Sequence, residues 1–328
     1  MLKRLAIILP FAALALALCA AAAAAEGLKK AALALQWQPQ AQFAGFYVAQ
    51  AKGFYREAGV DMTIIPGGPD SVASRLLTSG RAQFATMFLA TGIERRAEGM
   101  PIVNLAQLVQ HSALMLVARA DAGISTPRDL DGRRVGLWDN EFGLQPRALF
   151  KRLGIHPKIV PQSNTLNLFL MRGVDAVSGM WYNEYHLLLA SGLNPDEMTV
   201  FFYRDLDLNF PEDGVYTMES TLENDPELCR AVVAASLRGW EYAFAHPEEA
   251  LALVLKTMHA AHLPTNLAHQ RFMLARMRDV ILGRPGDPPR TLGRLAPGDY
   301  ARVAQTLDEL GLIKERPQLA VFARSPLQ

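Results

Sequence analysis

Short apolar runs alternate with amphipathic stretches through the first part of the chain. Residues 31–35 and 60–65 have the length and apolar character of β-strands, and residues 45–58 between them carry apolar side chains three and four apart, as in a helix. Gly59 follows this helical stretch as a C-cap residue. Strand, helix and strand in this order form the unit of a parallel sheet covered by helices on both faces.

The same unit recurs further along the chain. Asp70 and Ser71 are suited to cap a helix that runs to Ser79 and is closed by Gly80. The remaining predicted strands are 82–87, 134–137 and 174–179, and the remaining predicted helices of this part are 92–98 and 142–153. A capped helical turn is predicted at 126–132.

The length of the chain predicts two lobes. About 300 residues remain after the first 25, which is too many for one ordinary core. A long apolar run at 105–118 is expected to cross into a second lobe, and 211–218 to return. We predict a two-lobed α/β fold, each lobe a mainly parallel sheet flanked by helices, with a ligand cleft between the lobes. The predicted first lobe contains 26–116 and 212–328, and the second 117–211.

The segment after residue 226 is predicted to be mostly helical. Amphipathic stretches cover 226–244, 247–260 and 297–310. Cys229 lies in the first of them, where a buried apolar thiol is the simpler interpretation.

The first 25 residues have the pattern of a secretory signal. Lys3 and Arg4 precede an apolar run and an alanine-rich stretch, so cleavage is expected near Ala25 and the mature protein in the periplasm. Cys19 suggests lipid attachment as an alternative, but the preceding Leu18 is bulkier than such sites prefer. Cleavage would leave Cys229 without a disulfide partner.

The overall charge and the histidines give no sign of nucleic-acid, membrane or metal binding. Thirty-three basic and 32 acidic residues are mixed along the chain, for a net charge of +1. His259 and His262 lie three apart and His269 is near, but no HExxH pattern is present and no acidic residue completes a ligand set. We expect a monomer without a metal or other cofactor.

Candidate binding residues follow the first predicted strand. Trp37, Phe43 and Tyr47 can stack on a flat ring, and the amide of Gln42 can donate and accept hydrogen bonds. The alternative is that these aromatic rings only fasten the loop to the core. Two glycines that follow the second strand, Gly67 and Gly68, offer backbone N–H groups to an anion, although a plain turn is the simpler interpretation.

A second aromatic cluster follows the strand at 174–179. Trp181 and Tyr182 can stack on a ring, and Glu184 can accept hydrogen bonds from an amine or an aminopyrimidine edge. A surface glutamate at a helix start is the alternative for Glu184. Trp138 follows another strand, and the neighbouring Asp139 and Asn140 are better explained as helix caps. All these loops follow strands, at the edge where open α/β sheets bind ligands.

Several of these residues stand in motifs that resemble one family. The motifs are Trp37-x-Pro39 with Gly45-x-Tyr47-x-Ala49, Lys52-Gly53-Phe54-Tyr55 with Gly59-Val60, Gly80-Arg81-Ala82-Gln83-Phe84, and Tyr182-Asn183-Glu184. In this order they resemble the bacterial sulfonate-binding and thiamine-pyrimidine (NMT1/THI5-like) substrate-binding proteins. The resemblance implies a binding protein that delivers its ligand to the permease and ATPase of an ABC importer.

The resemblance also implies a class of ligand. Members bind formyl-aminopyrimidine-type thiamine precursors, and related ones bind sulfonates, nitrate or riboflavin. By position, Trp37 corresponds to the ring-stacking residue and Glu184 to the acceptor at the base edge. Gln42-Phe43 stands where transporters of the thiamine precursor often have Asn-His, which leaves the ligand open.

Two alternatives to transport remain from the sequence. Some relatives are pyrimidine synthases that use pyridoxal phosphate, iron and a sacrificial histidine. Met87 and Thr91 stand where those enzymes have a lysine and a histidine, and their cysteine-rich iron motif has no counterpart. The other alternative is a sensory binding partner of a separate signalling protein.

Overall fold

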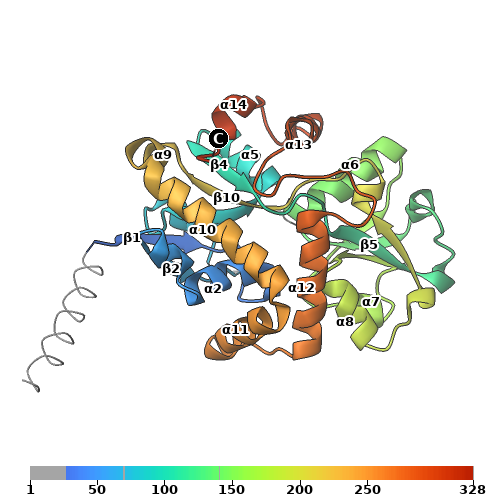
Figure 1. Ribbon diagram of the computed structural model, residues 1–328. Coiled ribbons are helices and arrows are strands. Elements are labelled where there is room, and N and C mark those ends of the chain that lie inside the picture. The colour runs from blue at the N-terminus through green and yellow to red at the C-terminus, as the bar shows by residue number, and fades with distance from the viewer. Residues whose placement is uncertain (1–26, 69–70, 140, 328) are drawn as a thin grey trace, which may run out of the picture.

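The computed structural model of the protein describes residues 27–68, 71–139 and 141–327. The expected signal segment with Cys19, and the expected helix caps Asp70 and Asn140, lie outside the described residues. Within the described part, the strands form two five-stranded sheets, each covered by helices (Figure 1). The predicted two-lobed α/β class is confirmed, and we call the parts built on the two sheets the first and second lobes.

The first lobe contains the first four strands of the chain and the last one. Its strand order is β2-β1-β3-β10-β4, and the β1–β2 and β1–β3 pairs are parallel. β10 is antiparallel to both of its neighbours, β3 and β4. The bounds are β1 Lys29–Ala34, β2 Val60–Ile65, β3 Phe84–Phe88, β4 Ile102–Gln107 and β10 Asp213–Met218.

The second lobe has the same arrangement and is built from the five strands that lie between β4 and β10 in the chain. Its order is β7-β6-β8-β5-β9, with β6 parallel to β7 and β8. β5 is antiparallel to β8 and β9. The bounds are β5 Leu114–Arg119, β6 Arg134–Leu137, β7 Lys158–Pro161, β8 Ala176–Met180 and β9 Met198–Phe202.

The expectation of mainly parallel sheets is wrong for the strands that come from the other lobe. A parallel neighbour needs a long crossover connection, usually a helix. The chain instead passes directly from β4 in the first lobe to β5 in the second, and it returns directly from the second lobe to β10 in the first. β5 therefore starts at the edge where β8 ends, and β10 starts at the edge where β3 ends, so both run antiparallel to these neighbours.

The two crossing segments pair with each other, and we call this pair of segments the hinge. The backbone N–H of Glu212 donates to the carbonyl of Val109 at 3.1 Å, and the N–H of Val109 donates to the carbonyl of Asp213 at 2.9 Å. The chain leaves the first sheet at Gln107 and enters the second at Leu114, so the predicted lobe boundary after residue 116 falls inside β5.

Most predicted helices are present, with bounds that differ by a few residues. The predicted helix at 45–58 is two helices because Gly53 adopts a left-handed backbone, with φ of +79°. The helices that flank the sheets are α2 Ala44–Ala51, α3 Phe54–Glu57, α4 Ala73–Thr78, α5 Leu89–Ala97, α6 Leu144–Leu153, α7 Asn167–Leu170, α8 Glu184–Ala190 and α9 Glu219–Asn224. The remaining helices are α10 Pro226–Ala245, α11 Pro247–Ala260, α12 Leu267–Leu282, α13 Pro297–Glu309 and α14 Leu319–Phe322.

The carboxyl-terminal helices complete the first lobe and reach the second. α10 packs against α2, and Cys229 on α10 is fully buried, as predicted. α12 contacts α8 of the second lobe and stands between the two lobes in Figure 1. Among the described helices, none combines the length and the apolar character needed to cross a membrane.

Candidate ligand-binding cleft

The fold brings the predicted binding loops to facing edges of the two sheets. β1 and β3 end at this edge of the first sheet, and β6 and β8 at the corresponding edge of the second. β10 and β5 begin there, because Asp213 pairs with Phe88 and Leu114 pairs with Met180. Open α/β sheets bind ligands beyond the carboxyl ends of their parallel strands, so this is the candidate cleft.

Gln42 is held by a carboxylate that sequence analysis missed. Its Nε2 donates to Oδ2 of Asp213 at 2.8 Å, and Gln36 donates to the other carboxylate oxygen. Gln40 Nε2 donates to Oε1 of Gln42 at 2.6 Å. The loop after β1 is therefore fastened to the first residue of β10, and the Gln42 amide has partners on both sides.

The three aromatic residues of this loop and helix have different surroundings. Phe43 is fully buried in the hydrophobic core, as expected for a ring that fastens the loop. Tyr47 is also buried, its hydroxyl has no hydrogen-bond partner, and burial raises the pKa of the phenol. Trp37 is half-buried and packs against the hydrophobic core.

Gly67 and Gly68 form a close turn beside Trp37. A Cβ on Gly67 would lie 2.2 Å from the carbonyl oxygen of Leu35, so the backbone passes too close for a side chain. The Gly67 N–H donates to the carbonyl of Trp37 at 3.0 Å. The Gly67 N–H is therefore engaged within the protein and is not available to an anion, so Gly67 fits the interpretation of a plain turn.

An aromatic contact joins the two lobes. The rings of Phe88, at the end of β3, and Phe142, from the second lobe, meet edge to face with centroids 5.1 Å apart. Trp138 contacts Phe142 at 5.1 Å, and its Nε1 donates to the carbonyl of Ser163 at 3.1 Å. Asp139 accepts from Arg147 at 3.0 Å in a surface ion pair.

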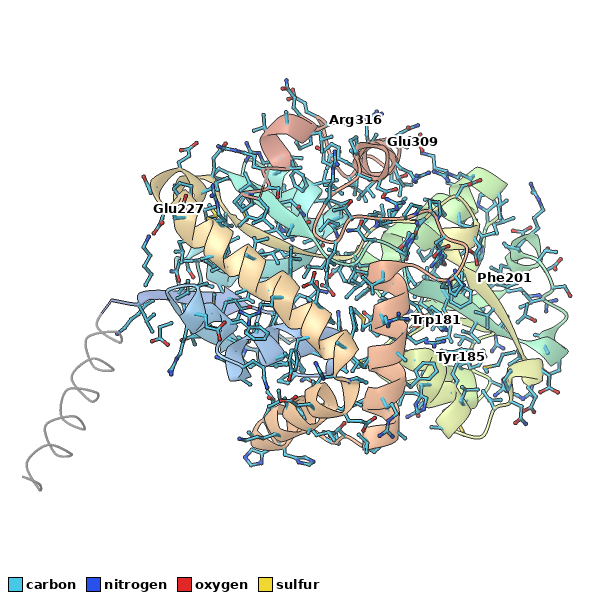
Figure 2. All side chains as sticks on the ribbon, in the orientation of Figure 1. Trp181, Tyr185, Phe201, Glu227, Glu309 and Arg316 are labelled. Carbon is cyan, nitrogen blue, oxygen red and sulfur yellow. The ribbon has the colours of Figure 1, made fainter. Side chains whose placement is uncertain are left out.

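Side chains from α12 and from the segment that follows it cover the ring of Trp181. The guanidinium of Arg276 lies 4.6 Å from the indole centroid and that of Arg284 lies 5.3 Å away. Phe202 packs edge to face against the same ring at 5.5 Å. Figure 2 shows Trp181 beside the helix that carries Arg276.

Tyr182 lies deeper in the cleft region than Trp181. It is almost fully buried, and burial together with the nearby carboxylates of Glu212 and Asp213 raises the pKa of its phenol. The structure thus brings Tyr182 of the second lobe close to the residues that begin β10.

Glu184 begins α8 and folds back on its own strand. Oε2 accepts from the N–H of Met180 at 2.8 Å, and Oε1 accepts from Nδ2 of Asn183 at 2.7 Å. Burial raises the pKa of the carboxyl, while these hydrogen bonds oppose that change. The carboxylate has more lone pairs than these hydrogen bonds use, so it can accept from a further donor.

A hydrogen-bond relay continues from Asn183 to the first lobe. Since Nδ2 of Asn183 faces Glu184, its Oδ1 accepts from Nε2 of His269 on α12 at 2.9 Å. A neutral His269 then accepts at Nδ1 from Nδ1 of His186 on α8, 3.0 Å away. Burial lowers the pKa of His269 to about 4 and also lowers that of His186, which keeps the pair uncharged at neutral pH.

Two adjacent carboxyls in the hinge complete the candidate cleft. Burial raises the pKa of Glu212 to about 8 and that of Asp213 to about 7. A pocket of about 20 Å³ between the lobes is bordered by Glu212 and by Phe88, Glu141, Phe142, Gln145 and Phe210. No sequence motif marks these two acids. Their position in the segment that returns to the first lobe was the one signal that could have found them.

No group of three or more histidines, cysteines or carboxylates suited to a metal ion occurs among the described residues. His259 lies in the last turn of α11, His262 follows that helix, and His269 is engaged in the relay.

Comparison with known proteins assigns the family. Residues 40–250 match the family described as NMT1/THI5 like. The chain belongs to this family. A riboflavin-binding protein RibY of Chloroflexus aurantiacus is 30% identical over 75% of this chain and 71% of that protein. A formylaminopyrimidine-binding protein of Halalkalibacterium halodurans is 27% identical over 73% of this chain and 74% of that protein.

Relatives with enzyme names and solved structures also match. A 4-amino-5-hydroxymethyl-2-methylpyrimidine phosphate synthase of Legionella pneumophila is 25% identical over 71% of this chain and 75% of that protein. The crystal structure of the periplasmic aliphatic sulphonate-binding protein SsuA from Escherichia coli has a TM-score of 0.69 and 17% identity, with 91% of this chain and 93% of that chain covered. This likeness confirms the periplasmic binding protein fold.

Proposed function

We propose that the protein is the periplasmic solute-binding component of an ABC importer and that its cargo is a planar nitrogen heterocycle of the aminopyrimidine, thiamine-precursor type. The observation that carries the proposal is the pair of facing sheet edges, joined by a hinge and furnished with aromatic rings and carboxyls from both lobes. Two relatives that cover most of the chain are named for binding heterocycles.

In this proposal each lobe supplies one side of the ligand site. Trp37, half-buried in the first lobe, stacks on the ring, and Tyr182 and Glu184 of the second lobe meet its other face and edge. The hinge lets the lobes close on the ligand, and the closed form presents one surface to the permease and ATPase. The protein acts as an exported monomer, released from its signal near Ala25, with lobes joined by the two crossing segments, the first of them between Gln107 and Leu114.

The proposal is binding without catalysis. Met87, where related synthases have a lysine, is buried and chemically inert, and Thr91 replaces their histidine. Neither side chain can form an imine or donate ring atoms to a pyrimidine.

A binding experiment with two loop variants tests the proposal. We expect the mature protein to bind 4-amino-5-hydroxymethyl-2-methylpyrimidine or riboflavin in isothermal titration calorimetry, without turnover. Trp37→Ala and Glu184→Ala should abolish binding while the circular dichroism spectrum stays unchanged. Wild-type affinity in both variants contradicts the assigned site. Formation of a pyrimidine from added pyridoxal phosphate and iron contradicts the transport proposal and supports a synthase.

A further inference from the structure

The two oxygens of the Glu212 carboxyl have unequal surroundings. Glu212 is 3% exposed and precedes the first residue of β10. Its Oε1 accepts from the backbone N–H of Ala113 at 2.6 Å and from Oγ of Ser112 at 3.2 Å. Its Oε2 is buried and has no hydrogen-bond partner.

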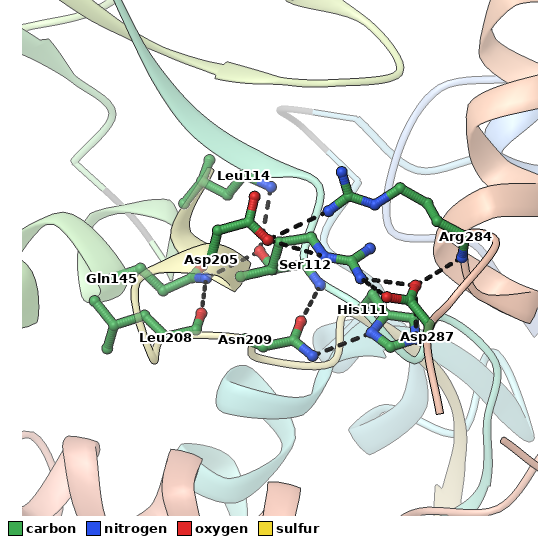
Figure 3. Close-up of polar contacts among 10 residues, drawn as sticks. His111, Ser112, Leu114, Gln145, Asp205, Leu208, Asn209, Arg284 and Asp287 are labelled. Carbon is green, nitrogen blue, oxygen red and sulfur yellow. Dashed lines mark hydrogen bonds and ion pairs between the residues drawn. The ribbon is translucent and has the colours of Figure 1, made fainter. Parts of the chain in front are cut away.

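The direction of the Ser112 hydrogen bond is fixed by its other neighbours. Ser112 Oγ accepts from Nε2 of Gln145 at 2.9 Å and from the N–H of Leu114 at 3.2 Å, contacts that Figure 3 shows. Both lone pairs of the hydroxyl are thus used, so its proton points to Glu212. Oε1 therefore accepts two hydrogen bonds, and a proton carried by the carboxyl must be on Oε2.

The pocket beside Glu212 lies between the lobes. Phe88 borders it from the first lobe, and Phe142 and Gln145 border it from the second. No lysine, arginine or histidine is among the described residues that line it. A buried acceptor without a partner is destabilising, more so when it is charged, so a donor that enters here gains an unusually strong partner.

We infer that Glu212 Oε2 is a subsite of the ligand cleft that accepts a hydrogen bond from an N–H group of the heterocycle, so that binding expels a proton from this carboxyl. The inference rests on the proposed function and adds to it a selection for ligands with an N–H donor edge. Glu212 also sits in the segment that joins the lobes, so a ligand bound there touches the hinge itself.

The charges around Glu212 explain why the proton is present before binding. Burial raises the pKa of Glu212 to about 8, and the negative charge of Asp213 adds to the effect. Glu141 at the pocket and the Tyr182 phenol are the other titratable groups that face this region, and none of them supplies positive charge. A protonated Oε2 cannot accept the ligand N–H well, because its hydroxyl is a weak acceptor.

The pH dependence follows from this competition. A ligand N–H favours the ionised carboxyl, so below the pKa of Glu212 each binding event releases about one proton. Affinity for a neutral donor ligand should therefore rise about tenfold per pH unit well below pH 8 and level off above it.

A matched pair of ligands and a matched variant test the subsite. The probes are 4-amino-5-hydroxymethyl-2-methylpyrimidine and its analogue with a methyl group in place of the 4-amino group. Glu212→Gln keeps an oxygen for Ala113 and Ser112 and puts an amide donor in place of Oε2. Calorimetry at pH 6.5–8.5 should show at least tenfold preference of the wild type for the amino compound, and loss of that preference in the variant. If riboflavin is the ligand that binds, riboflavin and 3-methylriboflavin replace this pair.

Proton release separates a ligand contact from a purely structural role. Titrations in two buffers with different ionisation enthalpies should give about one proton released by the wild type near pH 7 and none by Glu212→Gln. Glu227→Gln, on the exposed start of α10 and far from the cleft in Figure 2, should behave as the wild type.

The possible results distinguish this inference from the proposed function. If the wild type binds neither pyrimidines nor riboflavin, the proposed function fails, and the inference fails with it. If the wild type binds but Glu212→Gln keeps the same preference and the same proton release, the inference is overturned and the proposed function stands.

Discussion

At the scale of single residues, His111 in the first crossing segment shows how burial fixes a protonation state. Asn209 Oδ1 accepts from the N–H of Ser112 at 2.9 Å, so its Nδ2 must face His111 and donate to Nδ1 at 3.1 Å. Figure 3 shows this chain of contacts. Burial, with the Arg204 guanidinium nearby, lowers the pKa of His111 to about 4.

This depressed pKa predicts a loss of stability in acid. The unfolded chain binds a proton at His111 below about pH 6.5, while the folded chain does so only near pH 4. The stabilisation is therefore complete above pH 6.5 and falls by about 3 kcal/mol as the pH is lowered to about 4. We expect His111→Asn to remove this part of the pH dependence in urea unfolding measured from pH 7.5 to 4.

A surface histidine provides the comparison for that measurement. His156 is exposed, so His156→Asn should leave the unfolding curves of the wild type unchanged across the same range. If the free energy of unfolding changes equally with pH in the wild type and in His111→Asn, His111 is not the cause of the loss of stability in acid.

At the scale of secondary-structure elements, α2 and α10 are packed as closely as their backbones allow. A Cβ on Gly239 of α10 would lie 2.1 Å from the carbonyl oxygen of Gly45 on α2 and 2.8 Å from Cβ of Ala49. A Cβ on Gly45 would in turn overlap the ring of Trp240. The first α-helix after β1, which follows the Trp37 loop, is therefore positioned by two glycines.

The close packing predicts a large effect of one methyl group. Gly239→Ala must push the helices apart, so we expect it to lower the free energy of unfolding by about 1–3 kcal/mol despite the better helix propensity of alanine. Gly298, in the first turn of α13, has open space at its Cβ position, and Gly298→Ala should leave stability equal or slightly higher. Thermal unfolding of the two variants, measured side by side, checks this prediction. An equal loss of stability in both variants would contradict it.

At the scale of the whole molecule, the relay from Glu184 to α12 joins the two lobes. His269 is the member that contacts both His186 and Asn183 across the lobe boundary. Removal of the His269 ring nitrogens should lower the fraction of molecules whose lobes are closed. Because the closed form is the one that binds, the apparent affinity for the ligand should fall by the same factor. We expect His269→Leu to increase the radius of gyration in small-angle scattering and to weaken ligand binding several-fold.

A second α12 variant controls for general damage to that helix. Arg271 pairs with Glu248 of α11 within the first lobe, with nitrogen and oxygen 2.7 Å apart. Arg271→Gln should leave scattering and affinity unchanged. Unchanged scattering and affinity in His269→Leu would show that the relay does not hold the lobes together.

The hydrophobic pattern of the sequence determined the class of fold and many element bounds. Strand β6 at Arg134–Leu137 and the end of α6 at Leu153 match the prediction, because Gly154 takes a left-handed C-cap conformation that glycine adopts without strain. α10 and α11 were recognisable from their apolar faces and from Pro226 and Pro247 at their first positions. These features depend on residues that are neighbours in the chain.

Only the tertiary structure decided the direction of β5 and β10 and the partners of the polar groups in the cleft. Gln42 meets Asp213 across 171 positions of sequence, and Glu212 meets Ala113 across 99. Arg276 covers Trp181, a ring that the sequence alone made available to a ligand. Such partners follow from how two lobes pack around a hinge, and periodicity along the chain contains no information on contacts between segments so far apart.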